Sequence, residues 1–166
     1  MSKNRFISTT ISNIPLKGYV QSDGGTGTGS DVDFLSLDTD FTGYVDYLLF
    51  VSGHTAISED TNSSNTTRLR IILRDNLTSD EQIICGSRQA LGSHNGPTWD
   101  GNTLAYMSTS GYFALTSAYT TNNCTIQLNG GIDSPVGQFH WGDQSSYTNF
   151  DGEAFGASLY YILYKQ

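Results

Sequence analysis

The 166-residue chain has few charged side chains: only 14% of its residues are Asp, Glu, Lys or Arg, against about 25% in an ordinary soluble domain. Basic residues are the scarcer kind, 8 against 16 acidic residues, which gives a formal net charge of −8. We expect no nucleic-acid partner, because phosphate contacts need clustered Lys and Arg. No apolar run approaches the roughly 18 residues of a membrane span, so we expect no membrane insertion.

Cysteine is scarce too. Cys85 and Cys124 are the two in the chain, and neither stands in a C-x-x-C pair, so the sequence offers no zinc or thiol-redox motif. The basic start of the chain is not followed by an apolar signal-peptide core, and we therefore expect synthesis in a reducing cytoplasm. Two buried, reduced thiols are favoured there, with a disulfide as the alternative.

Acidic residues gather just after the glycine-rich stretch 24–30, which we expect to be a flexible loop. Asp31 and Asp33 would lie on one strand face, and oxygen-rich clusters of this kind can hold calcium. The D-x-D-x-D-G frame of a calcium loop is missing, and solvated strand ends are the simpler interpretation. We therefore expect no cofactor, with calcium at Asp31 and Asp33 as the alternative.

The chain is rich in β-strand signals. Apolar segments recur about every ten to fifteen residues with turn residues between them, which is typical of an all-β sandwich. Residues 68–75 (RLRIILRD) alternate between apolar side chains that face in and arginines that face out. The expected fold is a two-sheet antiparallel jelly-roll sandwich of about eight to ten strands. Residues 17–166 would form this single domain, and residues 1–16 an N-terminal arm or edge strand.

Two strands carry apolar side chains on both faces. A strand of a two-layer sandwich buries only one face in the core, so the apolar character of the other face needs an explanation. Residues 43–51 (GYVDYLLFV) and 154–164 (AFGASLYYILY) place large apolar side chains at successive positions. Such strands are covered on both sides, so we expect a second subunit over the outer face, as in a closed homo-oligomer. A single thick core closed by long loops is the alternative. The expected subunit-interface residues are Tyr44, Leu48, Phe50, Phe155, Leu159, Tyr160, Tyr161, Ile162 and Tyr164.

Three segments carry a family resemblance: residues 41–44 (FTGY), residues 69–76 (LRIILRDN) and residues 155–159 (FGASL). They resemble strand motifs of tumour-necrosis-factor-like jelly rolls, including the globular head of the complement first component. The chain departs from that pattern in its Phe-Gly order and in the polar stretch 86–102. The resemblance implies a ten-stranded jelly roll and a tight trimer whose axis is lined by aromatic residues, but not cytokine activity.

The same fold class occurs in phage and virus structural proteins. This chain resembles them in composition: few charges, many Ser, Thr, Asn, Gly and Tyr residues, and an acidic balance. By this analogy we expect a non-enzymatic virion protein that acts as a homotrimer, either in capsid decoration or cementing or as a minor capsid subunit. Its partners would be capsid or tail proteins. The absence of heptads favours these roles over a fibre.

The alternative is a host-receptor or glycan-binding head domain of a viral fibre. Its loops would offer aromatic platforms to a cell-surface glycan, namely Trp99, Trp141 and Tyr147. A hydrolase is a third and weaker hypothesis, in which Asp151 and Glu153 would act as paired carboxylates. The chain has no G-x-S-x-G elbow, and its three histidines lack a His or Cys partner at metal-ligand spacing. We therefore expect no catalytic residues.

Overall fold

The fold was analysed in a computed structural model that describes residues 17–22, 24–29, 31–59, 65–90, 92–93, 103–133, 139–142 and 156–165. Several expectations fall outside these ranges: the arm at residues 1–16 and the side chains of Trp99, Tyr147, Asp151, Glu153 and Phe155. None of the described segments forms a helix long and apolar enough to cross a membrane.

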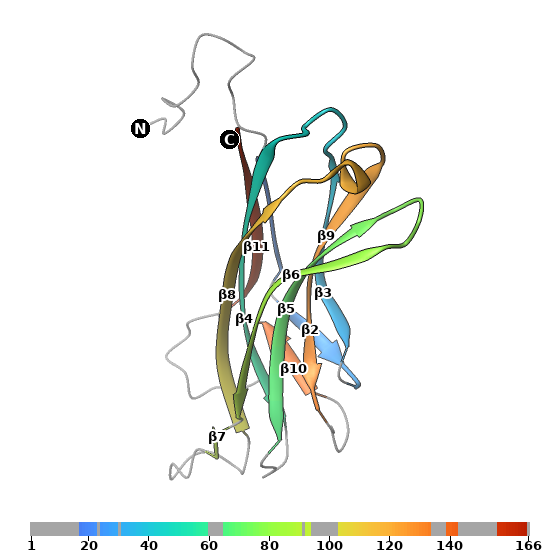
Figure 1. Cartoon of the computed structure of the whole chain (residues 1–166). Helices are drawn as coiled ribbons and strands as arrows, with labels where there is room; N and C mark the ends of the chain where they lie inside the picture. Colours follow the sequence, from blue (N-terminus) through green and yellow to red (C-terminus); the bar gives the residue numbers. More distant parts are fainter. Residues whose placement is uncertain are drawn as a thin grey trace.

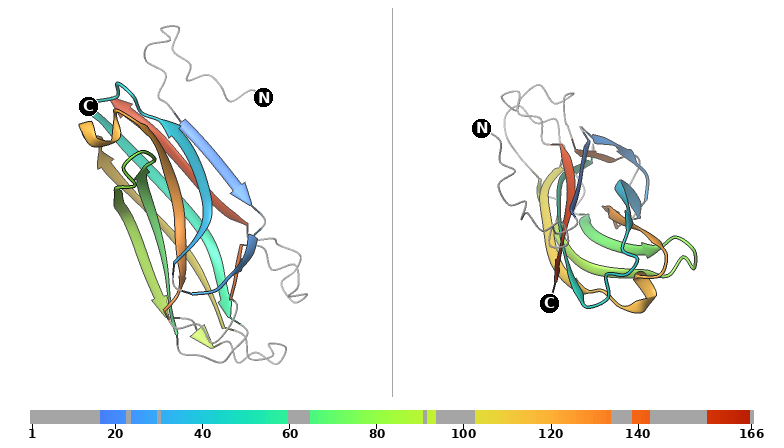
Figure 2. Two further views of the ribbon diagram at one scale, coloured as in Figure 1. Left: turned by 90° about the vertical axis from the view of Figure 1, so that its right-hand side faces the viewer. Right: turned by 90° about the horizontal axis from the view of Figure 1, so that it is seen from above.

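Two antiparallel sheets pack face to face, which confirms the predicted all-β sandwich (Figures 1 and 2). One sheet has seven strands in the order β1-β11-β4-β10-β2, with β8 pairing with β4 and β7 pairing with β8; the other has the order β3-β9-β5-β6. The strands are β1 (Lys17–Ser22), β2 (Gly24–Gly27), β3 (Val32–Asp40), β4 (Tyr47–Glu59), β5 (Thr66–Asp75), β6 (Glu81–Ala90), β7 (Gly92–Ser93), β8 (Thr103–Ala114), β9 (Asn123–Ile132), β10 (Phe139–Gly142) and β11 (Ala157–Lys165). A single 3-10 turn, Ser117–Tyr119, is the one helical element in the described ranges.

The core lies between the two sheets and follows the period-two pattern of the strands. On β5, Leu69, Ile71 and Leu73 are fully buried, as their alternation with the arginines predicts. The other large side chains that are fully buried come from both sheets and the connections between them: Phe41, Leu49, Ile57, Ile126, Leu128, Ile132, Phe139, Leu159 and Leu163.

Two segments differ from the sequence expectation. The strand expected from residue 43 begins at Tyr47, because Gly43 and Asp46 adopt positive φ angles of 81° and 68° in a turn. Residues Gly24–Gly27, expected to be a loop, form β2 and pair with β10. There a Cβ on Gly25 would lie 2.9 Å from the Trp141 ring, so only glycine lets the strand pass beneath the indole.

The β5–β6 hairpin turn is organised by Asp75, which is buried although it is charged. Its carboxylate accepts hydrogen bonds from the backbone N–H groups of Leu77 and Thr78 at 2.7 and 2.8 Å, and from the Asn122 side-chain amide at 2.8 Å. The Asn122 amide, followed by the backbone donors of the turn, holds the pKa of Asp75 below its usual value. The turn is therefore tied to the connection that precedes β9.

Asp75→Asn is expected to lower the free energy of unfolding near neutral pH. A carboxyl whose pKa is depressed in the folded state stabilises the fold above its unfolded pKa of 3.8, and this contribution disappears as the pH falls through the folded pKa. Urea unfolding at several pH values should show the gap between wild type and variant narrowing in acid. Asp80→Asn, an exposed carboxylate in the same hairpin, is the matched control. An equal loss in both variants would contradict this role of Asp75.

Candidate functional site

The outer face of the seven-stranded sheet gathers large apolar side chains from four neighbouring strands. Register aligns Tyr19 with Tyr160, and aligns Ile162 with Phe50 and Phe50 with Tyr112. Because side chains on one strand alternate between faces, these residues all point away from the core. We call this surface the aromatic face; it consists of Tyr19, Leu48, Phe50, Tyr112, Tyr160, Ile162 and Tyr164.

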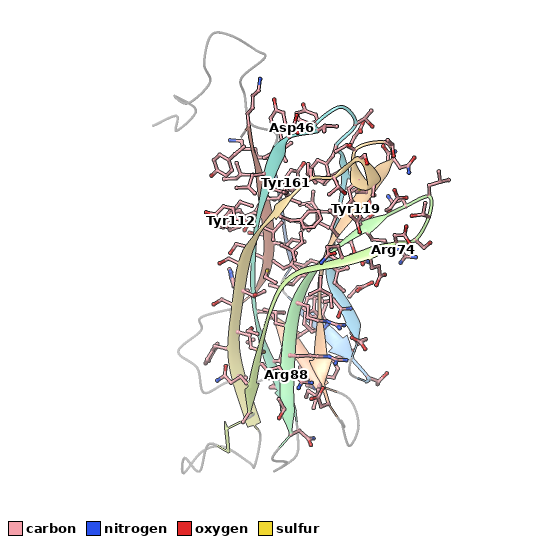
Figure 3. The ribbon with its side chains drawn as sticks, in the orientation of Figure 1. Asp46, Arg74, Arg88, Tyr112, Tyr119 and Tyr161 are labelled. Atoms are coloured by element: carbon pink, nitrogen blue, oxygen red, sulfur yellow. The ribbon has the colours of Figure 1, made fainter. Side chains whose placement is uncertain are left out.

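Phe50 lies at the centre of the aromatic face. Its ring centroid is 4.9 Å from that of Tyr112 and 5.9 Å from that of Tyr160. Tyr19, Tyr112 and Tyr164 keep 61%, 63% and 46% of their surface exposed. Figure 3 shows Tyr112 on the outer side of β8 and Tyr161 between the two sheets. Aromatic side chains that are this exposed and this contiguous form a surface patch of the kind that marks interaction sites.

The aromatic face is also poor in charge. None of the described, outward-facing side chains of β1, β11, β4 and β8 is an Asp or a Glu, although the chain carries a net charge of −8. Lys17 and His54 are the ionisable groups at its margins, apart from the tyrosines. The described part of this face therefore lacks the paired carboxylates that glycoside hydrolysis uses. Its apolar surface and peripheral hydroxyls suit a protein interface instead.

The residues expected at a subunit interface divide between the two sides of the sheet. Leu48, Phe50, Tyr160, Ile162 and Tyr164 lie on the aromatic face. The other described ones do not. Leu159 and Tyr161 are buried in the core of the chain itself, so their apolar character needs no second subunit, and Tyr44 packs edge-on against Tyr47 at 5.1 Å, near the start of β4.

Sequence reasoning missed two members of the aromatic face, Tyr19 and Tyr112. Tyr19 is flanked by Gly18 and Val20, and Tyr112 by Gly111 and Phe113; neither lies in one of the two segments that were identified as apolar on both faces. Each enters the patch because β1 pairs with β11 and β8 pairs with β4. These strand pairings join positions far apart in the chain, and a local pattern does not contain them.

The outer face of the four-stranded sheet is polar and is linked by ion pairs and hydrogen bonds. Arg68 donates to Asp31 at 2.7 Å, and Arg70 bonds both Asp31 and, at 2.7 Å, Asn129. Asp33 accepts from the side-chain amides of Gln127 at 2.8 Å and Asn129 at 2.7 Å. We call this network the polar ladder. The two outer faces of the sandwich are thus opposite in character.

Asp31 and Asp33, the alternative calcium ligands, both belong to the polar ladder. Their oxygens accept hydrogen bonds from guanidinium and amide groups of the chain itself, and calcium would have to displace these donors. Within the described ranges, no three His, Cys, Asp or Glu side chains are grouped as a metal site. The two carboxylates therefore serve to join β3 to β5 and β9.

Trp141, expected as an exposed platform for a glycan, is buried. Its ring stacks on Phe34 with centroids 5.0 Å apart and an interplanar angle of 23°, and only 8% of the residue is exposed. The sequence places it where a short strand ends and the loop 141–153 begins. In the structure β10 pairs with both β4 and β2, and the indole packs into the core. In this position Trp141 has no open ring face on which a sugar could stack.

Ser158 and His54 are in hydrogen-bond contact at the margin of the aromatic face, with Oγ and Nδ1 2.9 Å apart. They are cross-strand neighbours on β11 and β4. A hollow of about 340 Å³ lies beside them and is lined in part by Tyr106 and Ser108. No described carboxylate bonds the imidazole to orient it as a triad would require. The arrangement is that of a polar cross-strand pair.

The two cysteines are free thiols, one partly buried and one fully buried. Cys124 lies in the core, where burial raises its pKa to about 11. For Cys85 on β6, burial is again the main cause of a raised pKa. The reactive form of a cysteine is the thiolate, so raised pKa values make both thiols poor nucleophiles at neutral pH.

Comparisons with known proteins show a partial likeness in fold. No protein-family model matches the chain, and no curated protein matches it. Among solved structures, the infectious bursal disease virus VP2 subviral particle is 15% identical with a TM-score of 0.45, and covers 89% of this chain. The Gt strain of that virus gives 13% identity, a TM-score of 0.42 and 92% coverage; the Gx strain gives 15%, 0.40 and 90%. The chain spans only 32–38% of the length of these proteins.

Proposed function

We propose that this chain is a non-enzymatic structural subunit of a virion that assembles as a homotrimer through the aromatic face. One observation carries the proposal: a contiguous, carboxylate-free aromatic surface on one sheet of an acidic chain, opposite a sheet whose outer face is polar. Burying a large apolar side chain fully is worth about 1.5–3 kcal/mol. Several such side chains, half-exposed in one chain, therefore provide a strong drive for association.

A second copy of the same chain is the occupant that best fits the aromatic face. The acidic remainder of each chain repels other copies, so association concentrates on the aromatic face, whose described outward side chains include no carboxylate. Association through one self-complementary apolar face favours a closed assembly over an open fibre. The resemblance to tumour-necrosis-factor-like jelly rolls favours three copies around an axis lined by aromatic residues. A face-to-face dimer is the competing arrangement.

The virion role rests on composition and architecture. A charge-poor jelly roll rich in small polar residues suits a chain packed among like subunits in a shell, where charges would be buried. Among virion roles we propose capsid decoration or cementing, or a minor capsid subunit, with capsid or tail proteins as partners. The second outer face, with its polar ladder, would remain accessible in such a trimer.

Light scattering on the purified chain tests the assembly. We expect a mass of about 54 kDa, three times the 18.1 kDa of one chain. A mass of 18.1 kDa at micromolar concentration would contradict the proposal, and a mass of about 36 kDa would replace the trimer with the face-to-face dimer.

Quantitative mass spectrometry of purified particles tests the virion role. The chain should be present at a constant copy number per particle, and its absence from particles would overturn that role.

A further inference from the structure

An arginine-lined hollow lies on the outer face of the four-stranded sheet, on the opposite side of the sandwich from the aromatic face. Its volume is about 390 Å³, within the roughly 300–1,000 Å³ range of small-ligand sites. Figure 3 shows Arg88 near one end of the β5–β6 pair and Arg74 near the other. The hollow is lined at the Arg88 end by Arg68, Arg70, Ile83, Gly86, Ser87 and Arg88.

The hollow concentrates positive charge on an acidic chain. Each of the four arginines in the described ranges lies on β5 or β6, and three of them line the hollow. Arg68 and Arg88 stand directly opposite each other across the two strands, and like charges in that relation destabilise a sheet. The arrangement therefore needs an anion close by.

Carboxylates of the chain itself already show which anion fits. Asp133 lies between the opposed arginines, with Arg88 donating to Oδ2 at 3.0 Å and Arg68 Nη1 3.8 Å from Oδ1. Asp31 lies between Arg68 and Arg70 in the same way. The guanidinium groups are thus pre-arranged to bind planar carboxylates.

The hollow also has an unused donor and an open floor. The Nε of Arg70 is buried and has no hydrogen-bond partner among the described residues, which leaves a charged donor unsatisfied. Arg70 stands opposite Gly86. A Cβ on Gly86 would lie 3.3 Å from Arg70 Cγ and 3.1 Å from the Leu69 carbonyl oxygen, so the missing side chain keeps the floor of the hollow clear.

The remaining surfaces of the hollow suit a sugar ring. Ile83 is half-exposed and offers an apolar surface to the C–H face of a pyranose. We propose that this hollow binds the carboxylate of an acidic sugar, with Arg70 and Arg88 holding the carboxylate and Ile83 packing on the ring.

The proposal goes beyond the structural role, because it uses the opposite sheet and needs no particular oligomeric state. Calorimetric titration of the full chain with a sialylated trisaccharide tests it. The neutral methyl ester of the same trisaccharide and sodium acetate serve as matched probes. We expect the free acid to bind at least tenfold more tightly than either one, because the ester lacks the charge and acetate lacks the ring.

Arg88→Gln should weaken binding of the sialylated trisaccharide about tenfold, the loss expected for one charge-assisted contact. Arg88 is an exposed side chain, so the variant should fold, which a thermal unfolding curve checks. Arg74→Gln removes the same charge from the same face but outside the hollow, and should change affinity less than twofold. Asp133→Asn removes the internal competitor for Arg88 and should tighten binding several-fold.

Four results would overturn the proposal. Equal binding of the methyl ester would show that the charge is not recognised. Binding of acetate as tightly as the trisaccharide would show that the sugar ring contributes nothing to recognition. Equal weakening by Arg74→Gln and Arg88→Gln would reduce the effect to the general charge of the sheet. Absence of any binding by the wild-type chain would remove the site itself and leave the trimer proposal unaffected.

Discussion

Tyr112→Glu is expected to convert the proposed trimer into a monomer without unfolding the chain. Tyr112 is 63% exposed and its ring contacts Phe50 on the aromatic face, so the fold of one chain loses little. In the trimer the new carboxylate would be buried without a cationic partner, which costs about 3–5 kcal/mol, or more than two orders of magnitude in the association constant. Light scattering across a concentration series measures the mass.

Leu77→Glu is the matched control for this prediction. Leu77 is 76% exposed and lies in the turn between β5 and β6, on the sheet opposite to the aromatic face. The same added charge there should leave the trimer intact. If Tyr112→Glu remains trimeric, the aromatic face is not the interface; if both variants dissociate, the effect comes from net charge alone. Tyr112→Phe should assemble like the wild type, because it keeps the ring.

Gly130→Val is expected to lower the free energy of unfolding by about 3 kcal/mol or more, the upper end of the range for overpacking a core. Gly130 lies within β9 and faces Phe34. A Cβ there would stand 2.8 Å from the Phe34 ring and far too close to the Arg68 carbonyl oxygen on the paired strand β5. A backbone oxygen in a ladder cannot move aside as a side chain can. Urea unfolding followed by tryptophan fluorescence measures the loss, since Trp141 stacks on Phe34.

Gly43→Asn is the control for the glycine substitution. Gly43 has a φ of 81°, and an added Cβ there would meet no atom within 4 Å. Asparagine tolerates this left-handed backbone better than other side chains, so the loss should be a few tenths of a kcal/mol, as for surface substitutions in general. A loss below about 1 kcal/mol in Gly130→Val would show that β9 and Phe34 adjust without strain.

The sequence predicted strand character well where side chains alternate locally. Residues 68–75 show this best, because the apolar set of β5 is buried and its arginines face outward, as the pattern requires. The prediction was less accurate at glycines. Strand β9 runs to Ile132 through Gly130 and Gly131, since the Phe34 ring fills the space that a side chain at Gly130 would otherwise occupy. In the sequence a Gly-Gly pair is typical of a turn. Only the residues that pack against it across the core, such as Phe34, show that it belongs to a strand.

The candidate sites divide in the same way. The double-sided apolar strands predicted an exposed apolar surface, and five of the expected residues lie on it. The same two-faced pattern could not say which face was inside, so Leu159 and Tyr161 were expected at a subunit interface although they are buried in the core. The arginine-lined hollow had no sequence signal beyond the arginines of β5, because Arg88 and Gly86 join them only through the β5–β6 register.

By itself, the amino-acid sequence determined the all-β class, the alternation of most strands and the excess of aromatic surface, because each of these depends on side chains within a few residues of one another. The tertiary structure decided which strands became neighbours, and with that the composition of the aromatic face, the burial of Trp141 and the convergence of three arginines. Those features depend on pairings such as Tyr19 with Tyr160 and Arg70 with Asn129. The physical reason is that strand register couples positions far apart in the chain, and is chosen by the packing of the whole sandwich.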